Sequence, residues 1–225
     1  MEYELSSPNV LYVTTYSRIR DQIRQDILNS VFKPGVRLRI SELTNRYGVS
    51  QMPIREALQQ LQGEGLVTLL PQKGASVRKI DENFLSNMYD IRYAIETMLV
   101  RTGVEHMTDR DLKEIDLLQE EYEAYVSNRN REAALLVNEA FHRKINGLAN
   151  NYEAIEIIDR HWGLIDVLRR QFGFSEGRIH SIIDDHRKIV NALKRRDRDL
   201  SVRLTGEHVM KAKIDLIERF KQSQR

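Results

Sequence analysis

The chain has 225 residues, no cysteine and a formal net charge of +2, with 41% hydrophobic and 30% charged residues. The length suits one large or two small domains with a packed core, and the lack of cysteine excludes disulfides and thiolate metal sites. No apolar run approaches the roughly 18 residues of a membrane span and no signal peptide is evident, so we expect a soluble, cytoplasmic protein.

The first 80 residues predict several short elements. Residues 1–13 have no clear period and are expected to form a loose N-terminal arm. Apolar residues then recur at helical spacing from Thr15 to Val31, which predicts an amphipathic helix. Pro34 and Gly35 follow it and break the helical pattern.

Two further short helices are predicted, separated by a tight turn. The first covers residues 42–47, with Ser41 as its N-cap and Gly48 closing it in a left-handed conformation. The second begins after Ser50, its expected N-cap. Pro53 fits its first turn, where backbone N–H groups lack partners within the helix.

The second of these helices is followed by a predicted hairpin. Its buried stripe is expected to consist of Ile54, Ala57, Leu58 and Leu61. Two short β-rich runs then flank the turn at 71–74, which indicates two antiparallel strands. The order of helix, helix-turn-helix and hairpin predicts a winged helix-turn-helix domain over residues 14–79.

Residues 80–225 have a different character, with long helical patterns and no proline. Six helices are predicted near 81–106, 108–128, 130–149, 151–172, 175–195 and 198–222. Consecutive helices of about 20 residues joined by short breaks favour an antiparallel bundle. The predicted fold class is therefore mainly α, with a winged helix-turn-helix followed by a six-helix bundle.

Charge is distributed unevenly between these two parts. Residues 14–79 contain eleven Lys or Arg against five Asp or Glu, a net charge of +6, whereas residues 80–225 contain 24 against 26. A compact basic segment favours a polyanionic partner such as nucleic acid. A chance imbalance of surface charge explains the counts equally well.

The helix after Gly48 has the features of a recognition helix, which lies in the major groove with its N-terminal residues at base edges. Its expected outward residues are Ser50, Gln51, Met52, Arg55 and Gln59. Arg can bond to guanine and Gln to adenine through two hydrogen bonds each. Lys73 and Gly74 at the hairpin tip are expected to approach phosphates. The alternative is a small helical hairpin whose outward residues are merely solvated.

The stretch GVSQMPIREALQQLQGEGLVTLLPQKGASV closely resembles the winged-helix domain of GntR-type transcription regulators. The matching residues are Ser50, Pro53, Ile54, Arg55, Glu56, Ala57, Leu58, Leu61, Glu64, Gly65, Leu66, Gly74 and Val77. The resemblance implies a homodimer that binds a palindromic double-stranded DNA operator, most often as a repressor. Gln51 departs from the family's usual Arg, so the operator need not share the common guanine preference.

Three histidines fall on apolar faces of three different predicted helices: His142, His186 and His208. A lone buried His is more often a core residue than a ligand, but three such residues are less easily explained that way. Imidazole suits Zn, Ni, Cu or Fe, and three His leave room for water or a ligand. A metal-free polar pocket is the alternative.

Residues 81–225 resemble the FCD effector domain of the FadR branch of the same family, in its shorter six-helix, VanR-like type. The matching residues are Arg92, Glu96, Asn138, Phe141, His142, Asn151, His186 and His208. The resemblance implies a divalent metal (Zn, Ni, Mn or Fe) held by position 138 and the three histidines, beside which a small carboxylate effector binds. Asn138 replaces the expected Asp, so metal affinity should fall.

Arg92 is the candidate for grasping the effector carboxylate, because a guanidinium matches that group with two parallel bonds. An ion pair with Glu96 at i,i+4 is the equally weighted alternative. Two other functions are alternatives for the whole chain. One is a helical metalloenzyme that uses the three-His site with Glu139 as base; the other is a nucleic-acid-binding structural protein with an inert bundle.

Overall fold

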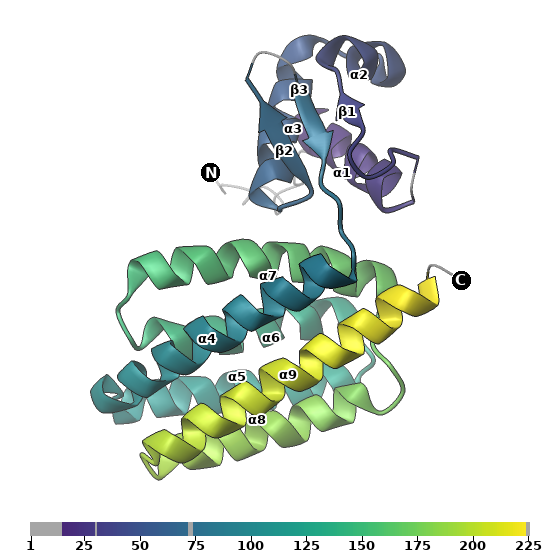
Figure 1. The fold of residues 1–225 in the computed structure, drawn as a ribbon. Coiled ribbons are helices and arrows are strands. Elements are labelled where there is room, and N and C mark those ends of the chain that lie inside the picture. The colour runs from purple at the N-terminus through teal and green to yellow at the C-terminus, as the bar shows by residue number, and fades with distance from the viewer. Residues whose placement is uncertain (1–14, 30, 72–73, 224–225) are drawn as a thin grey trace, which may run out of the picture. The chain divides into compact units, whose positions relative to one another are not determined.

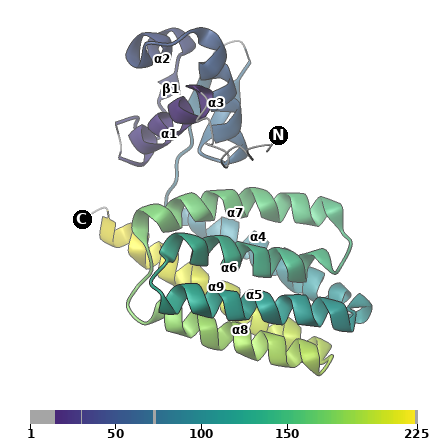
Figure 2. The ribbon, with the colours of Figure 1, turned by 180° about the vertical axis from the view of Figure 1, so that it is seen from behind.

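The computed structural model describes residues 15–29, 31–71 and 74–223. These residues form two compact units that divide after Arg78 (Figures 1 and 2). Helices dominate both units, which confirms the predicted fold class. None of the helices in the described ranges has the length and apolarity that crossing a membrane requires. The proposed N-terminal arm lies outside the described residues.

The first unit consists of three helices and a small antiparallel sheet. Its elements are α1 (Thr15–Leu28), β1 (Arg37–Leu38), α2 (Ile40–Tyr47), α3 (Gln51–Gly63), β2 (Val67–Leu70) and β3 (Gly74–Val77). The strand order is β1-β3-β2, so β3 is central and pairs with β2 as the predicted hairpin. The helix-turn-helix and the wing that follows it are confirmed.

Apolar side chains at helical spacing join α1 to α3. Ile19 and Ile23 of α1 are fully buried, as are Ile54 and Leu61 of α3. Burial of each such side chain contributes about 1.5–3 kcal/mol. All four residues of the predicted apolar stripe of α3 are buried, so the opposite face of this helix is exposed to solvent.

Two predicted boundaries in this unit were wrong. The first helix ends before Val31, whose amide donates to the Asp26 carbonyl at 2.8 Å and whose side chain is 51% exposed. The second helix begins at Ile40 with Arg39 as its N-cap, so Ser41 lies inside it. The reason is strand β1, which the sequence did not reveal and which leads directly into the helix.

The second unit contains the six predicted long helices, which are confirmed. They are α4 (Glu82–His106), α5 (Asp109–Ser127), α6 (Arg131–Gly147), α7 (Tyr152–Phe172), α8 (Arg178–Lys194) and α9 (Arg198–Ser223). Helices α4 and α9 lie side by side, as do α5 and α6 (Figures 1 and 2). Helix α8 contacts α5 and α9, and α7 contacts α4 and α6.

Polar side chains begin several of these helices. Thr108 and Asp111 form a capping box at the start of α5, while Asn130 and Asn151 accept backbone N–H groups at the starts of α6 and α7. Caps of this kind typically contribute about 1 kcal/mol each. Asn151 therefore lies at a helix end rather than among the histidines that it accompanies in the FCD pattern.

Helix α8 begins three residues later than predicted. Gly177 is its N-cap in a left-handed conformation, and Ser175 donates its amide to Asp215 of α9 at 3.0 Å. This connection therefore packs against α9 instead of extending the helix. Its position matters because it helps to close the cavities of the second unit.

Candidate functional site

The exposed face of α3 presents the residues predicted to read DNA. Ser50, Gln51, Met52, Arg55 and Gln59 are all exposed. Met52 is 64% exposed, a large value for an apolar side chain. The geometry thus agrees with an outward-facing helix; the role of each residue in DNA binding stays a prediction.

Arg55 has no acidic partner among the described residues, unlike four other arginines of this unit. Arg24 donates to Glu64 at 2.8 Å, Arg46 pairs with Asp26 at 2.9 Å, and Arg39 pairs with Glu42 at 3.0 Å. Those ion pairs hold the helices together or lie on their surfaces. The Arg55 guanidinium keeps all five N–H donors for an external acceptor.

Ser50 is the N-cap of α3, with φ −70° and ψ 171°, but its side chain makes no capping hydrogen bond. The hydroxyl and the first backbone N–H groups of the helix therefore remain as donors. A helix N-terminus of this kind favours an anion such as phosphate. The neighbouring prediction for Lys73 lies outside the described residues.

Gly74 requires a correction. The sequence suggested that this glycine allows close approach of DNA, but Gly74 is buried at the start of β3 with φ +91°. A Cβ atom there would overlap the carbonyl oxygen of Leu38 in β1. The glycine is needed for the sheet itself.

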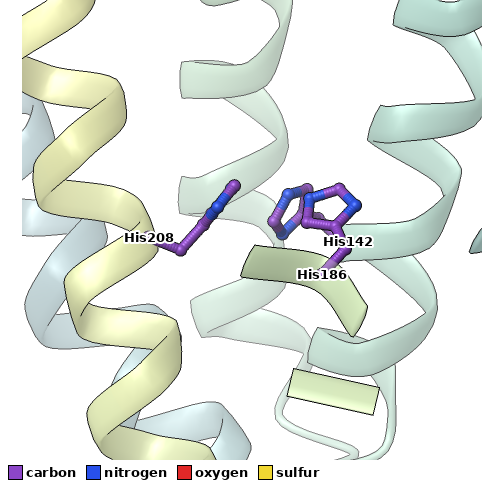
Figure 3. A group of neighbouring side chains, drawn as sticks. All are labelled: His142, His186 and His208. Carbon is purple, nitrogen blue, oxygen red and sulfur yellow. The ribbon is translucent and has the colours of Figure 1, made fainter. Parts of the chain in front are cut away.

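In the second unit, the three predicted histidines meet in the interior. His142 comes from α6, His186 from α8 and His208 from α9, and their rings face one another (Figure 3). One nitrogen from each ring lies within 4.8 Å of the other two, and all three side chains are buried. Two nitrogens bound to one ion at about 2.1 Å in tetrahedral geometry are about 3.4 Å apart, so a metal would draw the widest pair together by up to about 1.4 Å.

Two of the rings are oriented by acceptors behind them. His186 Nδ1 lies 2.8 Å from Oε1 of Gln119, and His208 Nδ1 lies 3.4 Å from a carboxylate oxygen of Asp185. An acceptor at Nδ1 places the proton there and leaves Nε2 as the free ligand atom, as is usual for metal-binding histidines. Neither acceptor was predicted from the sequence, although Gln119 interrupts an apolar stripe between Ile115 and Tyr122.

Buried polar atoms without partners indicate that this interior is built for a ligand. Among the described residues they include Asn138 Oδ1, His142 Nε2 and His186 Nε2. Leaving such a group unsatisfied costs about 1–3 kcal/mol each. An oxygen and imidazole nitrogens are suitable ligands for a divalent transition metal, so the residues present fit such an ion.

Burial also keeps the imidazoles neutral. Desolvation is the main reason that the pKa values of His142, His186 and His208 all lie below the usual histidine value, and for His142 and His186 they lie well below it. The neighbouring histidines and Arg92 lower the pKa of His142 further. Only neutral imidazole coordinates a metal, so the cluster is in the required protonation state at pH 7.

The stability of metal-free protein should therefore fall as the pH drops from 6.5 to 5. In the unfolded chain these histidines bind protons near pH 6.5, whereas in the folded chain they stay neutral to lower pH. The unfolded state therefore binds more protons in this window, and its free energy falls relative to that of the folded state on acidification. Half-buried Glu139, whose pKa is raised by desolvation, opposes the effect in part.

Thermal melts in matched buffers measure this dependence. His142→Asn should flatten it, whereas the same change at exposed His180 of α8 should leave it unaltered. A melting temperature that stays constant or rises on acidification would contradict the account.

A small cavity of about 40 Å³ lies beside the histidines. Its lining includes Tyr89, Arg92, Asn138, Glu139, Trp162, Arg178 and His208. Arg92 donates through Nε to buried Glu96 at 2.6 Å, so the ion pair considered from the sequence is present. The same guanidinium lies 4.2 Å from the Trp162 ring, and among the described residues its terminal nitrogens have no hydrogen-bond partner.

The structure adds a second arginine, Arg178, to this cavity. It is 6% exposed and uses one terminal nitrogen for Ser181 and Asp185, at 2.9 and 3.3 Å. Its Nε and other terminal nitrogen are buried without partners among the described residues. Two buried guanidiniums with spare donors create a cavity suited to an anion.

A winged helix-turn-helix with an exposed recognition helix, followed by a helical bundle around a polar cavity, defines a class of DNA-binding regulators. Comparison with known proteins supports this class. The family description "Bacterial regulatory proteins, gntR family" matches residues 15–77, and that of the FCD domain matches residues 87–211. The chain belongs to the GntR family of bacterial transcription regulators, in the group that contains an FCD domain.

Relatives and solved structures agree with this assignment. The transcriptional regulator YdhC of Bacillus subtilis is 25% identical over 88% of this chain and 87% of its own. The repressor GlaR of Escherichia coli is 29% identical over 84% and 89%. The structure of E. coli McbR/YncC superposes with a TM-score of 0.68 and 23% identity over 92% and 99% of the two chains. These are transcription regulators and not enzymes, so the metalloenzyme alternative is set aside.

Proposed function

We propose that this protein is a repressor that reads a palindromic operator through α3 and responds to a carboxylate bound in the cavity of the second unit. One observation supports both halves: unpaired donors are present on the exposed face of α3 and again in the buried cavity. Two of the relatives, RspR and GlaR of E. coli, have names that describe transcriptional repressors.

In the DNA complex, α3 enters the major groove by its N-terminal end. Arg55 bonds to the edge of guanine and Gln51 to adenine, each pair contributing roughly 1–3 kcal/mol of discrimination. Met52 and Gln59 extend the contact surface on the same face. Ser50 and the helix N-terminus bind a phosphate, and Lys73 of the wing adds a phosphate contact.

We propose that a divalent ion would be held by four residues: Asn138, His142, His186 and His208. All four are neutral, so no ligand compensates the ion's charge directly. Asp185 supplies a negative charge behind one ligand, through its hydrogen bond to His208. When bound, the ion would supply a Lewis-acid site for a carboxylate oxygen of the effector.

The carboxylate binds between Arg92 and Arg178, whose spare nitrogens line the same cavity. Arginine is suited to this role because its planar fork matches the two oxygens of a carboxylate. Glu96 and Asp185 hold the two guanidiniums in place. Their ion pairs keep the cavity from being strongly cationic when it is empty.

Coupling between the two units tests the proposal. Acetate, lactate, citrate and benzoate are screened for a rise in the melting temperature of the wild type and of Arg178→Gln. We expect at least one acid to raise the melting temperature of the wild type but not that of the variant. The same acid should change the affinity of the protein for the operator, and the operator should change the affinity of the protein for the acid by the same factor. If none of the acids acts on the wild type, the carboxylate part of the proposal is wrong.

A homodimer is proposed because α4 has a second apolar stripe that the single chain leaves open. Ile91 and Met98 are 45% and 42% exposed, and Ile95 between them is half-buried. Ile157 of the neighbouring helix α7 is 44% exposed. Exposed apolar residues at helical spacing are typical of a protein interface.

Ile91→Glu should weaken dimerisation by at least about tenfold, because a carboxylate would be buried without a partner. Light scattering after size-exclusion chromatography measures the mass across a dilution series. Leu117→Glu is the matched control, since Leu117 is 62% exposed on α5. Equal dimer content in the two variants would exclude this face.

A further inference from the structure

A second cavity lies next to the first in the helical unit, and its character is different. It has a volume of about 220 Å³ and lies where the end of α5, the start of α6 and the start of α8 meet. Most of its wall is apolar or aromatic: Tyr122, Tyr125, Val126, Ala134, Phe174 and Ile179. Nothing in the roles assigned above uses this space.

The two cavities share a boundary. Leu135, Asn138 and Phe174 line both of them. The shared amide is also the polar group whose Oδ1 is buried without a partner. A ligand placed against Arg92 and Arg178 therefore has an apolar space directly beyond Asn138.

Helix α6 forms a wall that runs from this space to the histidines. Arg131, Ala134, Asn138 and His142 follow at intervals of three or four residues, so they share one face of the helix. At about 1.5 Å per residue, the first and last are roughly 16 Å apart along the axis. A compact acid such as acetate fills only the inner end of this path.

We propose that the effector is a monocarboxylate with an elongated apolar body, its head between Arg92 and Arg178 and its body in the second cavity. This inference rests on the proposed carboxylate effector, and it specifies which class of carboxylate the effector belongs to. Arg129 and Arg131 line the outer end, but both are exposed to solvent and Arg131 donates to the backbone oxygen of Arg169, so a dicarboxylate finds no buried partner there and fits less well. Apart from the Asn138 amide, the wall between the two ends is mostly apolar.

Calorimetric titration of the full chain with straight-chain monocarboxylates of two to ten carbons tests the proposal. Affinity should rise about fourfold with each added carbon, the factor equivalent to ~0.8 kcal/mol per buried methylene. The gain should stop when the cavity is full. The heat-capacity change should become more negative over the same range, as apolar burial requires.

Two variants locate the apolar body. Ile179 is half-buried, and Ile179→Trp narrows the second cavity. The rise of affinity with acid length should therefore stop at a shorter acid, while the affinity for acetate stays unchanged. Ala134→Leu should likewise shorten the acid length at which affinity stops rising, and it replaces the first variant if that variant does not fold. Leu136→Phe lies on the exposed side of α6 and should behave as the wild type.

The possible failures are distinguishable. If acetate binds but longer acids bind no better, the apolar body is wrong and the carboxylate effector stands. If affinity rises only when the far end has a second carboxylate, the arginines at the outer end hold it and the proposal is overturned. If no acid binds, the carboxylate effector fails together with this inference.

Discussion

Arg55→Ala should weaken binding to the operator by about 5- to 150-fold, or roughly 1–3 kcal/mol, and relax the base preference at one position in each half-site. The expected loss is large because this guanidinium is exposed on α3 and is not committed to an ion pair among the described residues. Folding should be unaffected for the same reason. Fluorescence anisotropy with the operator and with single-base variants measures both effects.

Two controls separate base reading from charge. Arg55→Lys keeps the charge but loses the planar fork, so it should retain binding to unrelated duplex and lose discrimination. Arg39→Ala removes an exposed arginine of the same unit that is paired with Glu42. Arg39→Ala should change the salt dependence of binding more than the base preference. Unchanged operator affinity of Arg55→Ala would remove this residue from base readout.

His186→Ala should reduce bound metal from about one ion per chain to near zero. Three imidazoles and one amide oxygen form the whole proposed ligand set, so loss of a completely buried nitrogen ligand leaves two imidazoles. Elemental analysis of protein grown in metal-replete medium measures the content. Gln119→Ala leaves the ligands in place but frees His186 Nδ1, and should weaken metal affinity by about 10- to 100-fold.

His180→Ala is the matched control for this experiment. It lies on the same helix as His186 but is exposed, so its metal content should equal that of the wild type. Circular dichroism melts show whether each variant remains folded. A wild type without metal, or a folded His186→Ala variant with a full ion, would contradict the metal site while leaving the carboxylate site to be tested separately.

The helices of this protein were predictable because their apolar residues recur at intervals of three and four. Ile54, Leu58 and Leu61 specify which side of α3 is buried, so the outward face follows without any structure. Strand β1 was not predictable, because two residues are too few to show alternation. The role of Gly74 depends on that strand and was misread with it.

The histidine cluster was also predictable, since each His interrupts an apolar face of a different helix. Arg178 was not, because the first turn of a helix commonly places a charged residue in solvent. It is buried next to the connection before α8, which packs against α9 through Ser175 and Asp215. The apolar cavity likewise arises from three elements distant in sequence, and no local pattern encodes it.

Whether α3 reads base edges in duplex DNA is tested most directly by a selection experiment. The purified full chain selects from a pool of random duplexes at modest salt, and the retained fraction is sequenced. We predict a two-fold symmetric sequence that the Arg55→Ala variant enriches poorly or with one position degenerate. A retained pool without sequence preference would contradict the account.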